Sequence, residues 1–216
     1  MRSGEEILHS LYEKLGNDMN KEFLGKIEAV LLMPAILLYY LLLSRRVINL
    51  IISDIKVSEM PEVSFWSFAY NFAIHEDFRS TVYIRLGWKR IFISWIKPGA
   101  KCFYNLTSNY GDSLFIQHGF ATVVYAKSVG HHFFVNQQVT IGFGDDGNPT
   151  IGNYVSVRAG AKIIGNVTIG DDVIIGANAV VVKDVPAHSV VVGVPGRVIK
   201  TRVSMEEPWK RVDLKL

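Results

Sequence analysis

The sequence is poor in cysteine and carries little net charge. Among its 216 residues Cys102 is the only cysteine, so an intrachain disulfide and a cysteine metal cluster are both excluded. A lone thiol suits a reducing compartment, and we expect a cytoplasmic protein. The formal net charge is only +3, and the lysines and arginines are scattered rather than gathered into one basic stripe. Nucleic acid is therefore not expected as a partner.

A secretion signal is also lacking, because the first residues are partly acidic and no small-residue cleavage site follows an apolar run. The one long apolar run, Ile27 to Ser44, approaches the length of a membrane span. Glu28 and Pro34 interrupt it, and no second run lies beside it, which favours a buried or interfacial helix. Arg45 and Arg46 follow directly and can meet anionic headgroups, so peripheral contact with the inner membrane face stays open as an alternative.

The pattern of apolar residues changes just before the middle of the chain. Residues 1–96 are predicted to form a helical region, with helices from about Ser64 to Ile74 and from about Asp77 to Gly87, because apolar residues recur there at helical spacing. Residues 97–200 are predicted to form a β domain, and residues 201–216 a C-terminal tail.

From Ile151 onward, apolar residues recur with a period of six through the units IGNYVS, VRAGAK, IIGNVT, IGDDVI, IGANAV and VVKDVP. A helix would turn the sixth residue to another face, and a plain strand would require strict alternation. A triangular coil fits, because each six-residue side sends one large and one small apolar residue inward, while Gly, Asn and Asp occupy corners that need unusual backbone angles. Stacked coils then bury a continuous core. The side chains expected inside are those of Ile151, Val155, Val157, Ala161, Ile163, Val167, Ile169, Val173, Ile175, Ala179, Val181 and Val185.

The same register extends backwards through VVYAKS, VGHHFF and VNQQVT, and the stretch FGDDGNP from Phe143 to Pro149 interrupts it. Seven residues rich in Gly, Asp and Asn cannot join a packed coil. We therefore predict a loop that leaves one corner, and protruding loops on such scaffolds commonly carry function. The predicted fold is mainly β, a parallel β-helix, and the periodicity does not reveal its handedness.

Four segments carry a resemblance to a known family, namely LFIQHGFATVV from Leu114, VNQQVTIG from Val135, IGANAVVVKDVP from Ile175 and VVGVPGRVIK from Val191. They resemble the hexapeptide-repeat acyltransferases, in the branch of the serine acetyltransferases and the O-acetyltransferases of bacterial polysaccharide clusters. Upstream, EDFRSTVYIRLG from Glu76 is similar to the helix that precedes the β-helix in polysaccharide acetyltransferases. The resemblance implies a left-handed parallel β-helix, acetyl-CoA as acyl donor, no metal, and a homotrimer with active sites between subunits.

In that family the histidine of the H-G or H-A element is the general base, which by position is His118. A substrate hydroxyl has a very high pKa and must lose its proton as it attacks the thioester, and a histidine poised near neutral pH can accept that proton. Asp112 is the predicted acidic partner of His118, although its spacing is not the family's. A solvated structural histidine is the alternative reading of His118.

The same resemblance implies the cofactor residues. Backbone groups near Ala159 and Ala177 would bind the pantetheine arm, and Lys183 and Lys200 would reach the CoA phosphates. Phosphates need positive charge in a partly exposed cleft, and a narrow coil lets backbone amides approach closely. The alternative for Lys183 is a solvated lysine at a corner.

The chain departs from the serine acetyltransferases where those proteins hold the amino acid. They resemble each other in an aspartate before the catalytic histidine, an acidic residue before the PGAK turn and an Arg-His pair in the excursion loop. At these places this chain has Gln117, Trp95 and the loop residues Asp145, Asp146, Gly147 and Asn148. A hydroxyl of a sugar or polysaccharide precursor is therefore the predicted acceptor. Serine, as in cysteine biosynthesis, and a non-catalytic β-helix scaffold are the alternatives.

Overall fold

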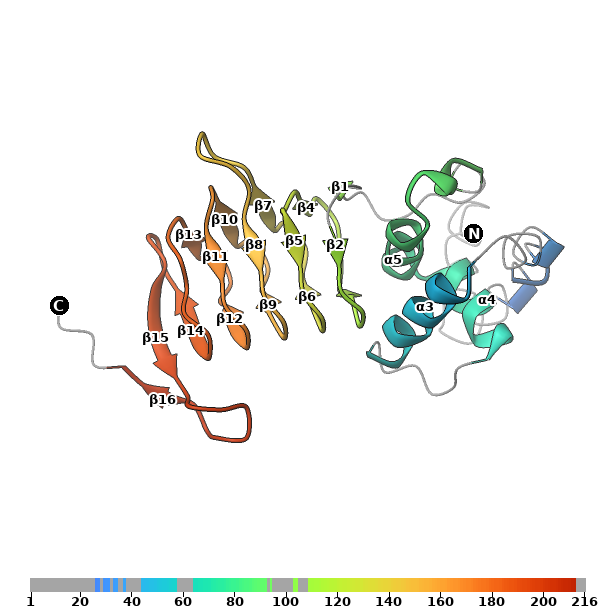
Figure 1. Cartoon of the computed structure of the whole chain (residues 1–216). Helices are drawn as coiled ribbons and strands as arrows, with labels where there is room; N and C mark the ends of the chain where they lie inside the picture. The colour runs from blue at the N-terminus through green and yellow to red at the C-terminus, as the bar shows by residue number, and fades with distance from the viewer. Residues whose placement is uncertain are drawn as a thin grey trace, which may run out of the picture.

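The computed structural model describes residues 26–27, 29–31, 33–34, 37, 44–57, 64–92, 94, 103–104 and 109–212. Helices come first along the chain, and a stack of parallel β coils follows (Figure 1). Trp95 and Cys102 lie outside the described residues.

The helices pack around a small apolar core of their own, which includes Ile55, Phe72 and Val82. Ser64 caps the first turn of α4, because its hydroxyl accepts a hydrogen bond from the Ser67 amide at 3.1 Å. The structure agrees with the two helices predicted between residues 64 and 87. The helical elements are α3 (Arg45–Val57), α4 (Phe65–Ile74), α5 (Glu76–Leu86) and the short 3₁₀ helix η1 (Gly87–Phe92).

The apolar run from Ile27 to Ser44 is described only in part. In its described residues Ala29 is buried, whereas Val30 is 52% exposed and Leu31 is 74% exposed. These exposed side chains show that the segment is not a fully buried helix. Within the described residues, no helix combines the length and the apolar character that a membrane span requires.

The β-helix is built from three sheets, because the chain turns a corner after each short strand and strands up to β10 pair in parallel with the strand three positions further along, while β12 pairs with β14. Sheet A contains β1 (Phe103–Tyr104), β4 (Val123–Val124), β7 (Thr140–Gly142), β10 (Lys162–Ile164) and β13 (Val180–Val181). Sheet B contains β2 (Asn109–Tyr110), β5 (Ser128–Val129), β8 (Thr150–Ile151) and β11 (Thr168–Ile169). Sheet C contains β3 (Phe115–Ile116), β6 (Phe134–Val135), β9 (Ser156–Val157), β12 (Val173–Ile175) and β14 (Ser189–Val192), and it continues in antiparallel fashion with β15 (Arg197–Thr201) and β16 (Lys210–Arg211). We name the corners AB, BC and CA after the sheets that they join.

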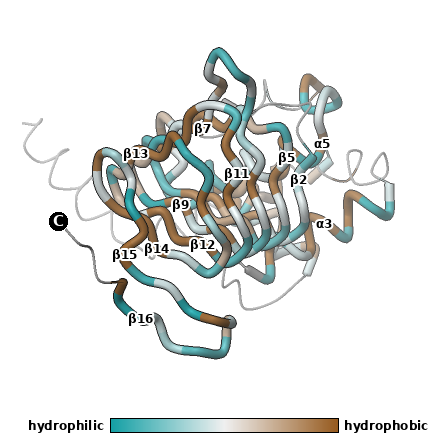
Figure 2. Tube along the Cα trace, turned by 60° about the vertical axis from the view of Figure 1, so that its left-hand side comes forward, coloured by the Kyte–Doolittle hydropathy of each residue, from teal (hydrophilic) through white to brown (hydrophobic). Residues whose placement is uncertain are grey.

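All twelve side chains that the period of six places inside are buried, and they form one continuous core. The parallel registers explain why: Val135, Val157 and Ile175 are direct partners on neighbouring coils, so equivalent residues stack on one another. Figure 2 shows apolar residues recurring from coil to coil. The predicted parallel β-helix after a helical region is confirmed.

The corners use left-handed backbone angles, and glycine does not fill most of them. At corner BC this conformation falls on Ser113, His132, Tyr154, Asp172 and His188, with φ between 54 and 57°. Such angles cost a non-glycine residue about 1 kcal/mol or more, so the hydrogen bonds between coils must hold them. One of these bonds joins the Tyr154 amide to the His131 carbonyl at 2.8 Å. The expectation of only Gly, Asn and Asp at corners was therefore too narrow.

The C-terminal residues cover the last coil. Strand β16 pairs with β15, and Arg202 forms an ion pair with the buried Asp172 while lying over the Trp209 ring at 4.2 Å. His188 also contacts the Asp172 carboxylate through Nδ1 at 2.8 Å. Part of the predicted tail thus belongs to the folded end of the β-helix.

Candidate functional site

His118 lies on an enlarged corner CA in the first coil. Six residues (117–122) separate Ile116 from Val123 there, whereas four (136–139) separate the partners Val135 and Thr140 in the next coil. The two extra residues lift the turn out of the regular stack. His118 itself is exposed and has a φ of 54°, in the left-handed region. The corner therefore presents the imidazole to solvent.

Hydrogen bonds hold this turn from both sides. On the side of the second coil, the Gln138 amide donates to the Phe120 carbonyl at 2.9 Å, and the Thr122 hydroxyl donates to the Asn136 carbonyl at 2.8 Å. On the helical side, the carboxylate of Asp77 accepts hydrogen bonds from the His118 and Gly119 amides, both at 2.8 Å. The turn is thus fixed while its side chain stays accessible.

The surroundings of the His118 imidazole are open and partly apolar. Within the part of the chain that the structure describes, no residue forms a hydrogen bond with the ring, and the neighbouring Phe120 is 58% exposed. Gln117, just before it, accepts a hydrogen bond from Asn136 Nδ2 at 3.0 Å. A base that is unpaired and exposed is available to a substrate hydroxyl.

The structure does not bring Asp112 to His118. Asp112 lies at corner BC, where its carboxylate is 2.6 Å from His131 Nδ1. Sequence spacing suggested a partner, but Asp112 and His118 flank strand β3 and therefore lie at its two opposite corners. The prediction of this acid–base pair is not supported, because Asp112 already has a histidine of the next coil as its partner.

Ala159 and Ala177 lie on corner CA in the third and fourth coils, in line with His118. The corner hydrogen bonds run along this line: the Gly160 amide donates to the Gln137 carbonyl at 3.0 Å, and the Asn178 amide donates to the Ala159 carbonyl at 2.9 Å. Among the described residues no backbone amide donates to the Ala177 carbonyl, although Val194 occupies the position equivalent to Asn178 in the following turn. Ala177 itself is exposed.

The two predicted phosphate-binding lysines lie apart from each other. Lys183 is exposed at corner AB and lines a cavity of about 180 Å³, together with Arg197 from the start of β15. Lys200 lies on β15, in register with Val190 of sheet C and Arg211 of β16. The structure therefore joins Lys183 with Arg197, rather than with Lys200, as a pair of cations at one cavity.

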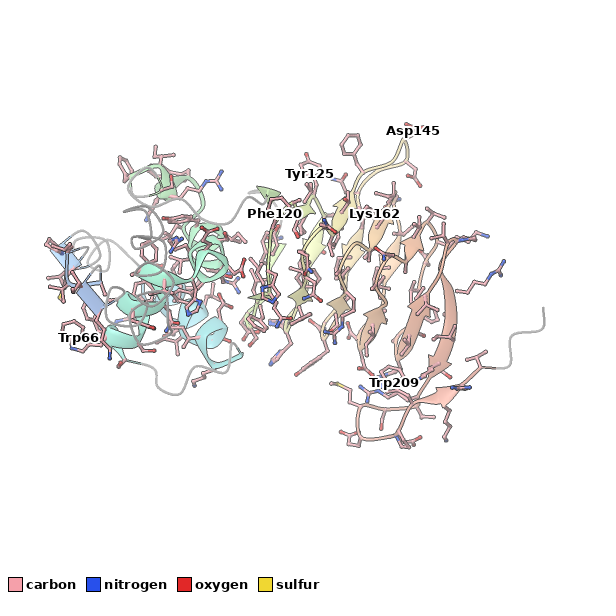
Figure 3. All side chains as sticks on the ribbon, turned by 180° about the vertical axis from the view of Figure 1, so that it is seen from behind. Trp66, Phe120, Tyr125, Asp145, Lys162 and Trp209 are labelled. Atoms are coloured by element: carbon pink, nitrogen blue, oxygen red, sulfur yellow. The ribbon has the colours of Figure 1, made fainter. Side chains whose placement is uncertain are left out.

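A further lysine, which the sequence did not single out, marks corner CA. Lys162 Nζ donates to the Gln138 carbonyl at 2.7 Å and to the Gly160 carbonyl at 2.9 Å, so its charge is held beside the line of corner residues. Figure 3 shows Lys162, Phe120, Tyr125 and Asp145 along one side of the β-helix. No sequence motif could reveal this lysine, because its partners are backbone carbonyls.

The predicted excursion leaves corner AB between β7 and β8 (Figure 1). Gly144 and Gly147 form an antiparallel bridge within it, and Asp146 Oδ1 accepts a hydrogen bond from the Asn166 amide at 3.1 Å. Phe143 is 69% exposed, and its ring lies 5.9 Å from that of Tyr125. In one chain, sheet A separates this loop from His118. Among the described residues no group of histidine, cysteine and acidic side chains could hold a metal ion.

Comparisons with known proteins bear on this site. Residues 148–183 match the family model described as bacterial transferase hexapeptide (six repeats). This part of the β-helix is therefore similar to the hexapeptide repeat of bacterial transferases. The serine acetyltransferase of Synechococcus elongatus is 42% identical over 109 residues, which cover 48% of this chain and 41% of the relative. That of Staphylococcus aureus (strain Mu50) is 41% identical over 110 residues, which cover 49% of this chain and 48% of the relative.

A solved structure agrees with these relatives. A serine acetyltransferase in complex with CoA superposes with a TM-score of 0.57 at 25% identity, and the match covers 71% of this chain and 69% of that one. The matched residues span less than half the length of the two curated relatives.

The predicted sugar or polysaccharide acceptor is wrong, because the curated relatives of this hexapeptide-repeat chain are serine acetyltransferases. The prediction rested on the absence of an acidic residue at Gln117 and of an Arg-His pair in the loop. The absence of these residues shows only that serine would not be bound by this particular set of side chains. Their absence does not tell which other side chains could bind serine, and for this reason the inference of a sugar acceptor failed.

Proposed function

We propose that this chain transfers the acetyl group of acetyl-CoA to the hydroxyl of serine, with His118 as general base. The observation that carries the proposal is the exposed imidazole of His118, which forms no hydrogen bond with the described residues and lies on a corner enlarged by two residues. The curated relatives named serine acetyltransferase support the choice of acceptor. The structural relative in complex with CoA supports the choice of donor.

The reaction needs one group that takes up and returns a proton. His118 accepts the proton of the serine hydroxyl as its oxygen attacks the thioester carbonyl carbon. The tetrahedral intermediate then collapses, the carbon–sulfur bond breaks, and the protonated imidazole returns the proton to the departing CoA sulfur. The products are O-acetylserine and CoA, and no covalent enzyme intermediate is required. An accessible imidazole can carry out both steps, because it accepts the proton in the first and returns it in the second.

The open side of corner CA provides a place for the donor. The unbonded carbonyl of Ala177 can accept a hydrogen bond from an amide of the pantetheine arm, and Ala159 lies one coil closer to His118. Lys183 and Arg197, which line a cavity at the end of the β-helix, offer positive charge to the CoA phosphates. In this proposal Lys200 is a weaker phosphate ligand than Arg197, because Arg197 lines the cavity of Lys183 and Lys200 does not.

The outer faces of the sheets support a homotrimer. Sheet B presents the polar residues Asn109, Ser128, Thr150 and Thr168. Sheets A and C are more apolar outside, and the residues that they present include Val123, Ile164, Val180, Phe115, Phe134, Ile174 and Val190. Three copies that bury these faces around one axis would place corner CA, with His118, at the boundary between subunits.

The proposal keeps the division into a helical region at residues 1–96, a β-helix domain at 97–200 and a tail at 201–216. In support, η1 ends at Phe92 and β1 begins at Phe103, on either side of the first boundary. The second boundary, between residues 200 and 201, falls inside β15. In this proposal the tail therefore packs on the last coil and is not a separate segment. A cytoplasmic location is part of the same proposal, since the lone cysteine suits a reducing compartment.

An acceptor assay tests the function. The purified protein is incubated with acetyl-CoA and either L-serine or a panel of sugars, and the release of free CoA thiol is followed. We expect thiol release that depends on L-serine and saturates with it. Release with a sugar but not with serine would overturn the acceptor, and no release with any acceptor would overturn the proposed activity.

A further inference from the structure

We propose that Asp77, on helix α5 of the N-terminal region, is the residue that positions His118 for proton transfer. The inference rests on the proposed function of His118 as the general base. It concerns a contact between two segments that are 41 residues apart in the sequence. Asp77 does not itself touch the substrate, so its effect passes through the backbone of the turn.

The geometry is that of a carboxylate bound by two successive amides. Asp77 Oδ2 accepts from the His118 amide at 2.8 Å, and Oδ1 accepts from the Gly119 amide at 2.8 Å. Two neighbouring N–H groups converge on one anion when the first residue adopts a turn or left-handed conformation. His118 has this conformation, with a φ of 54°. The charge of Asp77 therefore stabilises the very backbone angle that fixes the direction of the imidazole.

The corner of the first coil has a special need for such a partner. In later coils the corner amides of Gln138, Gly160 and Asn178 donate to carbonyls of the preceding coil. In the first coil, the turn amides of His118 and Gly119 donate instead to a carboxylate of the helical region. Asp77 thus provides at this corner the acceptors that carbonyls of the preceding coil provide at the later ones. The same two amides are consequently occupied and cannot stabilise the oxyanion of the intermediate.

Helix α5 holds the carboxylate in place. Asp77 is in the first turn of α5, where a negative charge is favoured by the helix dipole. The helix is anchored further along by Arg85, whose guanidinium pairs with Asp54 and whose Nη1 donates to the Tyr110 carbonyl at 3.3 Å. Helix α5 thereby takes part in positioning His118, and it does so through Asp77.

Two substitutions of Asp77 and two controls test this inference. Asp77→Asn keeps the size but turns an N–H donor toward one of the two amides, whereas Asp77→Glu keeps both acceptor oxygens. Ser53→Ala is the control for docking, because Ser53 and Ser113 form a 2.7 Å hydrogen bond across the same interface, away from His118. Glu76→Gln is the control for the helix dipole, since Glu76 is exposed in the same first turn.

We expect Asp77→Asn to lower kcat by about ten- to a hundredfold, the scale for a small misplacement of a catalytic group. The KM for acetyl-CoA should stay within about twofold, because the donor site is not touched. Asp77→Glu should recover part of the lost kcat, and both controls should retain it. Thermal unfolding of all four variants shows whether each is folded at the assay temperature. An equal fall of kcat in Ser53→Ala would overturn the inference in favour of general loosening of the interface.

Amide hydrogen exchange gives a readout that does not depend on activity. In Asp77→Asn the amides of His118 and Gly119 should exchange faster, whereas in Ser53→Ala they should not. Unchanged exchange would show that the two hydrogen bonds to Asp77, which we call the clamp, do not hold these amides. Faster exchange with an unchanged kcat would show that the clamp exists but does not position His118. If the wild-type chain does not acetylate serine, the proposed function fails, and the exchange experiment alone then decides whether the clamp exists.

Discussion

Asp54 and Arg85 form a buried ion pair that also closes the open end of the β-helix. Arg85 Nε and Nη2 each donate to the Asp54 carboxylate at 2.7 Å, and the amide of Leu114 in the first coil donates to the same carboxylate at 2.7 Å. Burial raises the pKa of Asp54, and the hydrogen bonds from Arg85 and Leu114 oppose this effect. With Asp77, this makes two carboxylates of the helical region that bind amides of the first coil.

Removal of the Asp54 carboxylate should therefore destabilise the protein strongly. Asp54→Ala leaves the Arg85 guanidinium, whose side chain is only 3% exposed, as an unpaired buried charge. A broken buried pair costs about 3–5 kcal/mol. We expect a loss of this size in the free energy of unfolding by urea, with Ser53→Ala as a mild comparison at the same interface. A loss of under about 1 kcal/mol would show that the pair is not buried in solution.

The opposite end of the β-helix should govern stability in acid. Burial alone would raise the pKa of Asp172, but the hydrogen bonds from Arg202 and His188 outweigh it, and the net effect is a lowered pKa. A carboxyl whose folded-state pKa is lowered contributes stability above its unfolded value of about 3.9, and this stability is lost as the pH falls through the folded-state pKa.

Asp172→Asn should consequently flatten the loss of stability below about pH 4, while lowering stability at neutral pH. Urea unfolding at a series of pH values between neutrality and strong acid measures both effects. If the variant and the wild type lose stability in parallel over the acid range, Asp172 is not responsible for the acid dependence.

Close stacking of the coils at corner BC predicts a glycine requirement. A Cβ built on Gly130 would lie 2.5 Å from the Gly152 carbonyl oxygen of the next coil, and backbone cannot move aside there without disturbing the stack. Gly130→Ala should cost about 1–3 kcal/mol, as overpacking does. Gly142→Ala is the matched control, because its nearest neighbour would be a side-chain carbon at 3.8 Å. Equal stability of the two variants would contradict the tight packing of this corner.

Active sites between subunits predict complementation. A His118→Ala subunit and a subunit that lacks residues 143–149 should each be inactive alone. After dissociation and reassociation of a mixture, some clefts receive an intact His118 from one subunit and an intact loop from another. We expect partial recovery of activity in samples whose mass corresponds to a trimer. A stable monomer with full activity would contradict this arrangement.

The fold could be predicted from the sequence because burial follows the period of six directly. Every inward position from Ile151 to Val185 is buried, since a slip by one residue would expose the whole set. The helices followed from apolar spacing in the same way. The corner conformations were less predictable, because His132 and Tyr154 adopt left-handed angles through hydrogen bonds with neighbouring coils.

The site was only partly predictable. His118 was found through its flanking motif, but the contact with Asp77 was not, because its partners are backbone amides and every residue has one. The contact of Asp112 with His131 was also not foreseen, because distance along the chain does not tell which corner a residue occupies. The acceptor was misjudged because missing side chains were taken as evidence for another substrate.

The most direct test of the account is the rate at which O-acetylserine forms from acetyl-CoA and serine, measured for the wild type and for His118→Ala. The account predicts that the wild type forms the ester and that the variant is slower by about a hundred- to ten-thousandfold, the scale for a positioned general base. Binding of acetyl-CoA, measured by calorimetry, should be unchanged in the variant. Near-normal formation of O-acetylserine by His118→Ala would contradict the account.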